Sequence, residues 1–109
     1  MTEASVVIDV GDIPPGGMRA VEAGGLPILV CNVAGEFFAL ENRCPHVRIP
    51  LDGGRLEGPV LQCPLHGGKL DVRDGASLAP PIRRAACTYP VRIVEGGIAI
   101  ELEASACTT

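Results

Sequence analysis

Apolar and polar positions alternate in short segments along most of the chain, and turn residues separate these segments. Within residues 89–94, Val91 and Ile93 alternate with Pro90 and Arg92, which is typical of a strand with one buried face. The same criterion predicts strands at residues 5–10, 18–22, 27–33, 36–41, 89–94 and 98–102. No segment keeps a helical period of apolar residues over three turns, so the pattern predicts an all-β protein.

Short glycine-containing turns indicate where neighbouring strands pair. Ala34-Gly35 joins the third and fourth predicted strands, and Glu95-Gly96-Gly97 joins the last two, so each pair is expected to form a hairpin. Residues 43–84 differ, because no clear alternation surrounds their turns, Asp52-Gly53-Gly54 and Asp74-Gly75. We therefore expect an irregular, loop-rich insertion over residues 43–84, held by a scaffold of strands.

The composition fits a single domain over residues 1–109. The chain is 47% apolar, which suffices for a hydrophobic core, and it has 14 glycines and 10 prolines, which favours many turns. The net charge of −4 argues against nucleic acid as the main partner. The charge is unevenly placed: residues 43–84 hold seven basic and four acidic residues, a balance of +3, whereas the rest of the chain carries −7.

The five cysteines are not expected to form disulfides. Their number is odd, the N-terminus shows no signal-peptide pattern, and no apolar run reaches the roughly 18 residues of a membrane helix. These features predict a soluble, cytoplasmic protein that does not bind membranes. Cys31, Cys87 and Cys107 are then expected to be free thiols, with Cys31 a small core residue inside an apolar run.

Two elements carry evident chemistry, Cys44-Pro45-His46 and Cys63-Pro64-Leu65-His66, and they contain both histidines of the chain. Thiolate and imidazole ligands suit zinc or an iron–sulfur cluster. Zinc fingers usually pair cysteine with cysteine and histidine with histidine, whereas each element here supplies one of each. Ligands as close as Cys44 and His46 reach two adjacent irons more easily than one ion. The spacing therefore favours a two-iron cluster, with a structural zinc site as the alternative.

This pair of elements resembles the signature of the Rieske [2Fe–2S] proteins, in which two cysteines hold one iron and two histidines hold the other. Weaker similarities extend over nearly the whole chain, at residues 12–16, 35–40 and 89–92. The resemblance implies a Rieske fold, with an antiparallel β-sandwich or barrel-like base and a small cluster-binding subdomain inserted at residues 43–84. It is strongest to the bacterial Rieske-type ferredoxins of ring-hydroxylating dioxygenase systems.

The resemblance assigns four ligands to one [2Fe–2S] cluster. Cys44 and Cys63 would bind the iron that stays ferric, and His46 and His66 would bind the iron that accepts the electron near the surface. The surrounding basic residues, Arg48 among them, would favour the reduced cluster and attract an acidic partner.

Several positions near the ligands follow or depart from the family pattern. Residues 67–68 would let backbone N–H groups approach the sulfides, and Pro80-Pro81 would lie in the loop that covers the cluster. Ile49 and Leu65 stand where high-potential Rieske proteins carry an extra cysteine, and Gly68 stands where they carry a serine. These departures imply a potential in the lower part of the Rieske range of roughly −150 to +300 mV.

The expected function depends on the assignment of both histidines to the cluster, which leaves none for a second iron site. A catalytic Rieske oxygenase also needs a mononuclear iron held by two histidines and a carboxylate, and this chain has no further histidine. We therefore expect no catalytic residues. The resemblance implies a monomeric one-electron carrier that takes electrons from a flavin-dependent NAD(P)H reductase and passes them to a terminal oxygenase that hydroxylates aromatic rings. The alternatives are a small Rieske subunit of a larger oxidoreductase, such as a nitrite reductase, and a structural zinc module.

Overall fold

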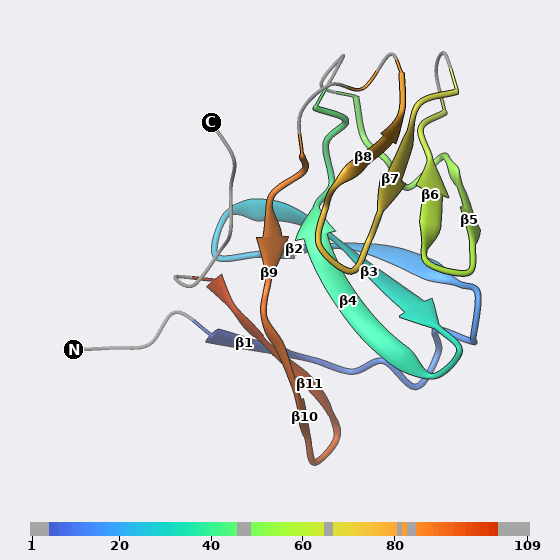
Figure 1. The fold of residues 1–109 in the computed structure, drawn as a ribbon. Helices are drawn as coiled ribbons and strands as arrows, with labels where there is room; N and C mark the ends of the chain where they lie inside the picture. The colour runs from blue at the N-terminus through green and yellow to red at the C-terminus, as the bar shows by residue number, and fades with distance from the viewer. Residues whose placement is uncertain (1–4, 46–48, 65–66, 81, 83–84, 103–109) are drawn as a thin grey trace.

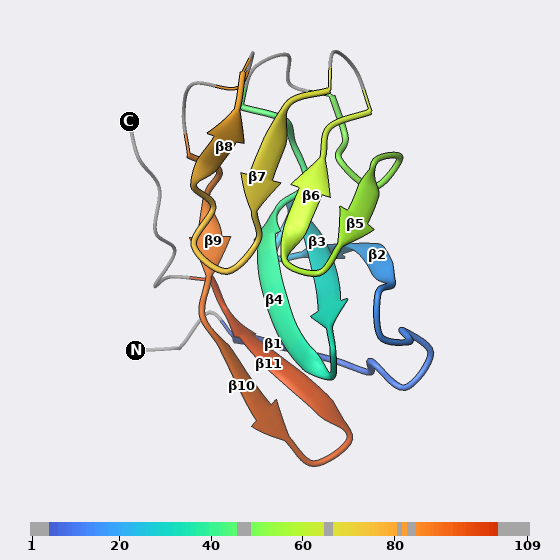
Figure 2. The ribbon, with the colours of Figure 1, turned by 45° about the vertical axis from the view of Figure 1, so that its right-hand side comes forward.

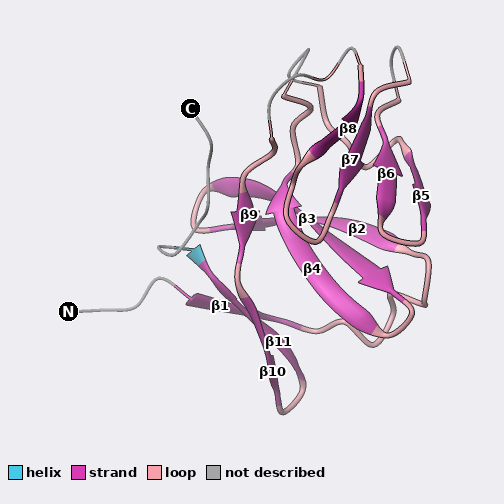
Figure 3. Ribbon diagram, viewed as in Figure 1, coloured by secondary structure: helices cyan, strands magenta, loops and turns pink. Residues whose placement is uncertain are grey.

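The computed structural model of the protein describes residues 5–45, 49–64, 67–80, 82 and 85–102. Within these ranges the regular elements are eleven strands in three antiparallel sheets (Figure 1). Among the described residues Leu102 alone has a helical (3-10) conformation, and Figure 3 shows that strands make up the regular structure. None of the described residues forms a helix of the length and apolarity that crossing a membrane requires. The expected all-β fold is confirmed.

Each sheet brings together a different part of the chain. The outer sheet has the order β1-β11-β10, with β1 at Ser5–Ile8, β11 at Gly97–Glu101 and β10 at Val91–Val94. The central sheet has the order β2-β3-β4-β9, with β2 at Met18–Ala23, β3 at Leu26–Val33, β4 at Glu36–Glu41 and β9 at Thr88–Tyr89. The small sheet has the order β5-β6-β7-β8, with β5 at Arg55–Glu57, β6 at Val60–Gln62, β7 at Lys69–Asp71 and β8 at Ser77–Ala79.

Both expected hairpins are present, but the strand predicted at residues 89–94 is divided between two sheets. β9 pairs with β4 of the central sheet, whereas β10 pairs with β11 of the outer sheet. Pro90 lies between β9 and β10, and proline has no N–H to donate to a sheet. The chain therefore changes sheets at Pro90.

The expectation that residues 43–84 are irregular was wrong in part, because they contain the small sheet. Each of its four strands has only three residues, which is too short for alternation to be recognised. A register shift between Lys69 and Leu70 interrupts the pattern further. The boundaries proposed for a cluster-binding subdomain stay a prediction.

The central sheet is buried on both faces, because it separates two hydrophobic cores. Along β3, Leu29 and Cys31 belong to the core shared with the small sheet, and Ile28 and Val30 belong to the core shared with the outer sheet. Successive side chains of a strand point to opposite faces, so a continuous apolar run serves both cores. We call the first of these the upper core, because the loops that carry Cys44 and Cys63 are built on it.

Asp71 ends β7 and is 9% exposed. Its carboxylate accepts hydrogen bonds from Arg73 through N at 2.9 Å, Nε at 3.0 Å and Nη2 at 2.7 Å. These bonds from the arginine hold the pKa of Asp71 below its ordinary value. A depressed pKa in the folded state stabilises the fold above the unfolded-state pKa of about 3.9, and this contribution is lost as the pH falls through the folded-state pKa.

We expect Asp71→Asn to lower the urea midpoint of unfolding modestly at pH 7, because the amide cannot accept both bonds from the guanidinium as a carboxylate does. The difference from the unaltered protein should shrink below about pH 4. Urea titrations followed by circular dichroism measure both effects. Glu57→Gln is the matched control, because its ion pair with Arg55 is exposed and contributes little. If Asp71→Asn lowered the urea midpoint by the same amount at every pH, the stabilisation could not come from the charge of the Asp71 carboxylate.

Candidate metal centre

Two strands from different sheets lead to the same end of the molecule. β4 of the central sheet and β6 of the small sheet both point toward the upper end in Figure 1, and the rotated view in Figure 2 agrees. Cys44 comes shortly after β4, and Cys63 follows β6 directly. The fold therefore brings the two cysteines to one end, as a shared metal site requires.

The two cysteine loops are closed in the same way. The backbone N–H of Cys44 donates to the carbonyl of Ile49 at 2.8 Å, and that of Cys63 donates to the carbonyl of Gly68 at 2.7 Å. Each bond joins a cysteine to the fifth residue after it, so in sequence each predicted histidine falls between the two ends of a closed loop. The two loops are thus closed by equivalent hydrogen bonds, although the histidine is the second residue after Cys44 in one loop and the third after Cys63 in the other.

Both cysteines are buried at the edge of the upper core. Cys44 is 0% and Cys63 is 3% exposed, and neither is in a disulfide. Leu51, Leu61 and Leu70 belong to the same cluster and are fully buried. A thiolate in apolar surroundings needs a positive partner, and a bound iron or zinc supplies one. The two sulfur donors therefore fit the cysteine half of the predicted site.

The other half of the predicted site lies outside the described residues. His46 and His66 fall there, as do Arg48, Leu65 and Pro81. In the described ranges no group of three or more metal-ligating side chains is found, which follows from the position of both histidines. Ligation by His46 and His66 stays a prediction.

Asn42 joins the two ends of the first cysteine loop, and sequence reasoning missed it. Its side-chain Oδ1 accepts hydrogen bonds from the N–H of Leu51 at 2.7 Å and of Asp52 at 3.1 Å. Its Nδ2 donates to the Asp52 carboxylate at 3.2 Å. A single asparagine between a strand and a cysteine carries no recognisable sequence signal, because its partners are in the returning chain.

Near the cysteine loops, Gly54 and Gly68 are two of the glycines at which a neighbouring backbone or side chain approaches too closely for a Cβ. A Cβ on Gly54 would overlap the carbonyl oxygen of Gln62, whereas the sequence had indicated only a turn there. A Cβ on Gly68 would lie 2.5 Å from Cγ1 of Ile82, a residue that is 3% exposed. Ile82 thus packs directly on the second cysteine loop, and its carbonyl accepts a short hydrogen bond from the Ser77 hydroxyl.

The basic character of residues 43–84 is partly neutralised. Of the four basic residues described there, Arg43, Arg55 and Arg73 lie 3.7, 2.9 and 2.7 Å from a carboxylate of Glu41, Glu57 and Asp71. A steering patch would therefore depend on Lys69 together with basic residues outside the described ranges.

The remaining cysteines follow the prediction only in part. Cys31 is a fully buried free thiol, and burial raises its pKa to about 12, so it stays protonated and unreactive. Cys87 is disulfide-bonded, so the expectation of a free thiol was wrong there. Pairing depends on which cysteines the fold brings together, which an odd count cannot reveal. Cys107 lies outside the described residues.

A three-sheet β fold that ends in two matching cysteine loops defines the class of protein as a small all-β metalloprotein. The chain belongs to the Rieske [2Fe-2S] domain family, which matches residues 3–90. One Rieske-type [2Fe–2S] cluster is the cofactor of this family, and the two buried cysteines fit it. The expected family and cofactor are confirmed.

Characterised relatives match over most of their length. The chain is 41% identical over 98 residues to the ferredoxin component of biphenyl 2,3-dioxygenase from Rhodococcus jostii (strain RHA1), covering 90% of this chain and 92% of the relative. It is 37% identical over 92 residues to the ferredoxin component of naphthalene 1,2-dioxygenase/salicylate 5-hydroxylase systems from Ralstonia sp, covering 84% and 88%.

Solved structures agree with these relatives. The ferredoxin of carbazole 1,9a-dioxygenase from Nocardioides aromaticivorans IC177 superposes with a TM-score of 0.84 at 29% identity, covering 90% of this chain and 97% of that one. A chain in a complex of reduced oxygenase and oxidized ferredoxin in carbazole 1,9a-dioxygenase has a TM-score of 0.84 at 30% identity, covering 92% and 94%. These relatives are electron-carrying components and not the catalytic enzymes of their systems.

Proposed function

We propose that this protein is a one-electron carrier of a multicomponent aromatic ring-hydroxylating dioxygenase system. Cys44 and Cys63 would bind one iron of the cluster, and His46 and His66 would bind the other. The observation that carries this proposal is the pair of matching loops, each of which holds a buried cysteine at its base. When bound, the cluster supplies reversible one-electron reduction at the histidine-bound iron.

The residues of the chain have three tasks in this function. The backbone bonds of Cys44 and Cys63 hold the sulfur ligands at fixed positions. The leucines of the upper core exclude water from the sulfur side. Both histidines are used as ligands, so the chain carries no second iron centre of the two-histidine, one-carboxylate type and passes its electron to another protein.

The partners would be a flavin-dependent NAD(P)H reductase and a terminal oxygenase. Support comes from relatives that are ferredoxin components of dioxygenase systems, and from a relative seen in a complex of oxygenase and ferredoxin. A carrier must leave each partner quickly, so docking would involve a small interface around His46 and His66. We place the protein, as a monomer, in the cytoplasm.

Iron and sulfide analysis of purified variants tests the site. Cys44→Ala, Cys63→Ala, His46→Ala and His66→Ala should each lose the cluster and its rhombic EPR signal on reduction. Cys31→Ala is the matched control, because Cys31 is an equally buried free thiol that lies within β3 opposite Phe38 and not in either cysteine loop, and it should keep the full cluster content. Stoichiometric zinc in protein purified without added iron or zinc, together with no reducible colour, would overturn the proposal.

Electron transfer tests the function. The dithionite-reduced holo-protein, freed of excess dithionite, should be reoxidised in a stopped-flow experiment by the oxygenase component of a biphenyl dioxygenase. The control is the same experiment with the oxygenase left out. Purification from its native host as a fixed complex with a large oxidoreductase chain would instead support the subunit alternative.

A further inference from the structure

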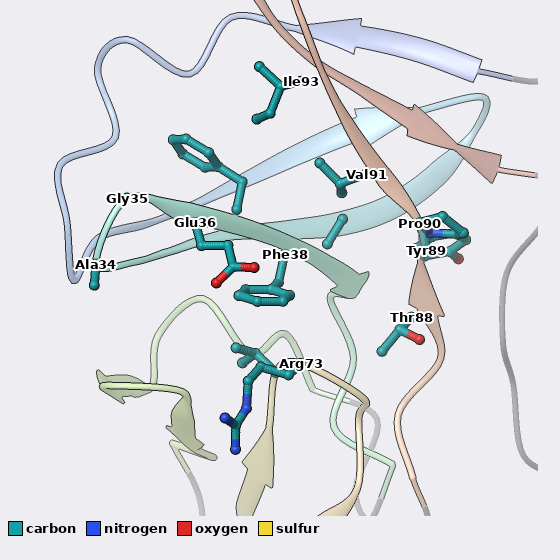
Figure 4. A pocket seen from close by; sticks show the side chains of 13 residues that line it. Ala34, Gly35, Glu36, Phe38, Arg73, Thr88, Tyr89, Pro90, Val91 and Ile93 are labelled. Carbon is teal, nitrogen blue, oxygen red and sulfur yellow. The ribbon is translucent and has the colours of Figure 1, made fainter.

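A groove with a volume of about 750 Å³ opens beside β4. It lies between the first half of β4, β10 of the outer sheet and the turn that follows β7 (Figure 4). Glu36 begins β4, whereas Cys44 follows the other end of the strand, so the groove is remote from the metal centre along β4. The proposed electron-transfer function does not involve this groove.

Two open strand edges border this groove. β4 pairs with β3 along its whole length, but it pairs with β9 only at Ala39 and Leu40. Among the described residues, 36–38 therefore have no strand partner on the side of the groove. β10 pairs with β11 on one side, and the described strands provide no partner on its other side. Open edges present unpaired N–H and C=O groups and are templates for an added strand.

Apolar side chains flank the open edge of β4 on both faces. Phe37 packs on the core of the outer sheet, and Phe38 packs on the upper core. Ile93 of β10 lies directly opposite the fully buried Ile98, so its side chain is on the core-facing side, yet it is 74% exposed. Figure 4 shows Ile93 and Val91 on one side of β4 and Arg73 on the other. A strand added to β4 would cover apolar groups with alternate side chains.

The charge around the groove is negative. Glu36 lines it, and Asp9 lines an adjoining hollow that shares Phe37 and Ile93. Arg73 also lines the groove, but its guanidinium is paired with Asp71 at 2.7 Å. The chain outside residues 43–84, which supplies most of the lining, carries a net charge of −7. This charge disfavours a second copy of the same surface and favours a basic partner.

We propose that β4 accepts an extended segment of a partner protein, in which alternating apolar residues are flanked by lysine or arginine. The segment pairs through its backbone with residues 36–38, in the mode of β-strand addition. Its alternating apolar side chains contact Phe37 and Ile93 on one face of β4, its intervening polar side chains lie on the face of Phe38, and its basic ends lie near Glu36 and Asp9. A partner bound here leaves the end of the molecule that carries Cys44 and Cys63 free for electron transfer.

The probe is the acetylated and amidated peptide Lys-Val-Thr-Val-Thr-Val-Lys, titrated into the ¹⁵N-labelled oxidised holo-protein. We expect saturable shifts of the amides of residues 36–38 and 91–93, with a Kd on the order of 100 µM for so short a strand. Replacing the central valine with proline should abolish binding, because proline cannot donate to the added ladder. Replacing both lysines with glutamate should weaken binding at least fivefold.

Variants of the protein distinguish peptide binding in the groove from non-specific binding elsewhere on the surface. Glu36→Lys and Ile93→Thr should each weaken peptide binding at least threefold. Val7→Thr is the matched control, because Val7 is an apolar residue of the outer sheet that is 62% exposed but does not line the groove, and it should leave the Kd unchanged. The proposal is overturned by the absence of saturable shifts, by shifts elsewhere on the surface, by an equal effect of Val7→Thr, or by dimerisation through the groove.

Discussion

Replacing Gly54 with alanine is expected to prevent the protein from holding its cluster. The added Cβ would overlap the carbonyl oxygen of Gln62 and would lie 3.1 Å from the carbonyl oxygen of Leu51. These are backbone atoms, which cannot rotate away as a side chain does. Overpacking in a fixed core typically costs 1–3 kcal/mol, and we expect about 3 kcal/mol or more here because the backbone itself must move.

The position of the clash makes the effect specific to the metal centre. Gln62 ends β6 and directly precedes Cys63, and the next residue after Gly54, Arg55, pairs with Gln62 in the small sheet. Separating β5 from β6 at this point displaces Cys63. Gly54 also donates its N–H to the carbonyl of Leu51 at 2.9 Å, so the turn after the first cysteine loop moves as well.

Gly53→Ala is the matched control for this prediction. A Cβ on Gly53 would meet only the ring of Pro64, at 3.9 Å, which is ordinary van der Waals contact. Both variants add one methyl group to the same turn, and neither glycine has a positive φ. Iron and labile sulfide per chain, together with the urea midpoint, should fall sharply for Gly54→Ala and stay close to the unaltered protein for Gly53→Ala. Equal cluster content in the two variants would contradict the argument.

The contrast between Gly53 and Gly54 shows what the sequence could and could not predict. Strands such as β3 and β4 were predictable because alternation and a glycine turn are local signals. Cys44 and Cys63 could be singled out as candidate ligands because their spacing to histidine is itself chemical information. The need for glycine at residue 54 was not, because it depends on the carbonyl of Gln62, which only the folded sheet brings close.

The same limit applies to the small sheet and to Asn42. Strands of three residues, one of them with a register shift, are stabilised by neighbours across the sheet and by the upper core, and not by a pattern within each segment. Asn42 acts through the amides of Leu51 and Asp52, which return to it only after the loop has closed. Pro90 did carry a signal, since a residue without an N–H marks where a strand cannot continue in one sheet.

Replacing Gly68 with alanine is expected to displace Ile82 from the second cysteine loop and to shorten the lifetime of the cluster. The new Cβ would lie 2.5 Å from Cγ1 and 2.8 Å from Cδ1 of Ile82. Ile82 is 3% exposed, and its carbonyl accepts a hydrogen bond from the Ser77 hydroxyl, so it has little room to withdraw. We expect a loss of stability of about 1–3 kcal/mol, as for other overpacked sites.

A second substitution distinguishes this contact from a direct effect on the loop backbone. Ile82→Ala alone should cost about 2–4 kcal/mol, because it removes buried methyl groups. In the double variant the methyl group on residue 68 occupies part of the space that Ile82 leaves. The loss of stability in the double variant should therefore be smaller than the sum of the two single losses, by about 1 kcal/mol or more. Free energies of unfolding from urea titrations of the four proteins of the cycle give this coupling, and half-lives of the visible absorption in urea give the lifetime of the cluster. Strict additivity would mean that Gly68 is needed for its own backbone conformation or for its N–H, and not for the space that it leaves to Ile82.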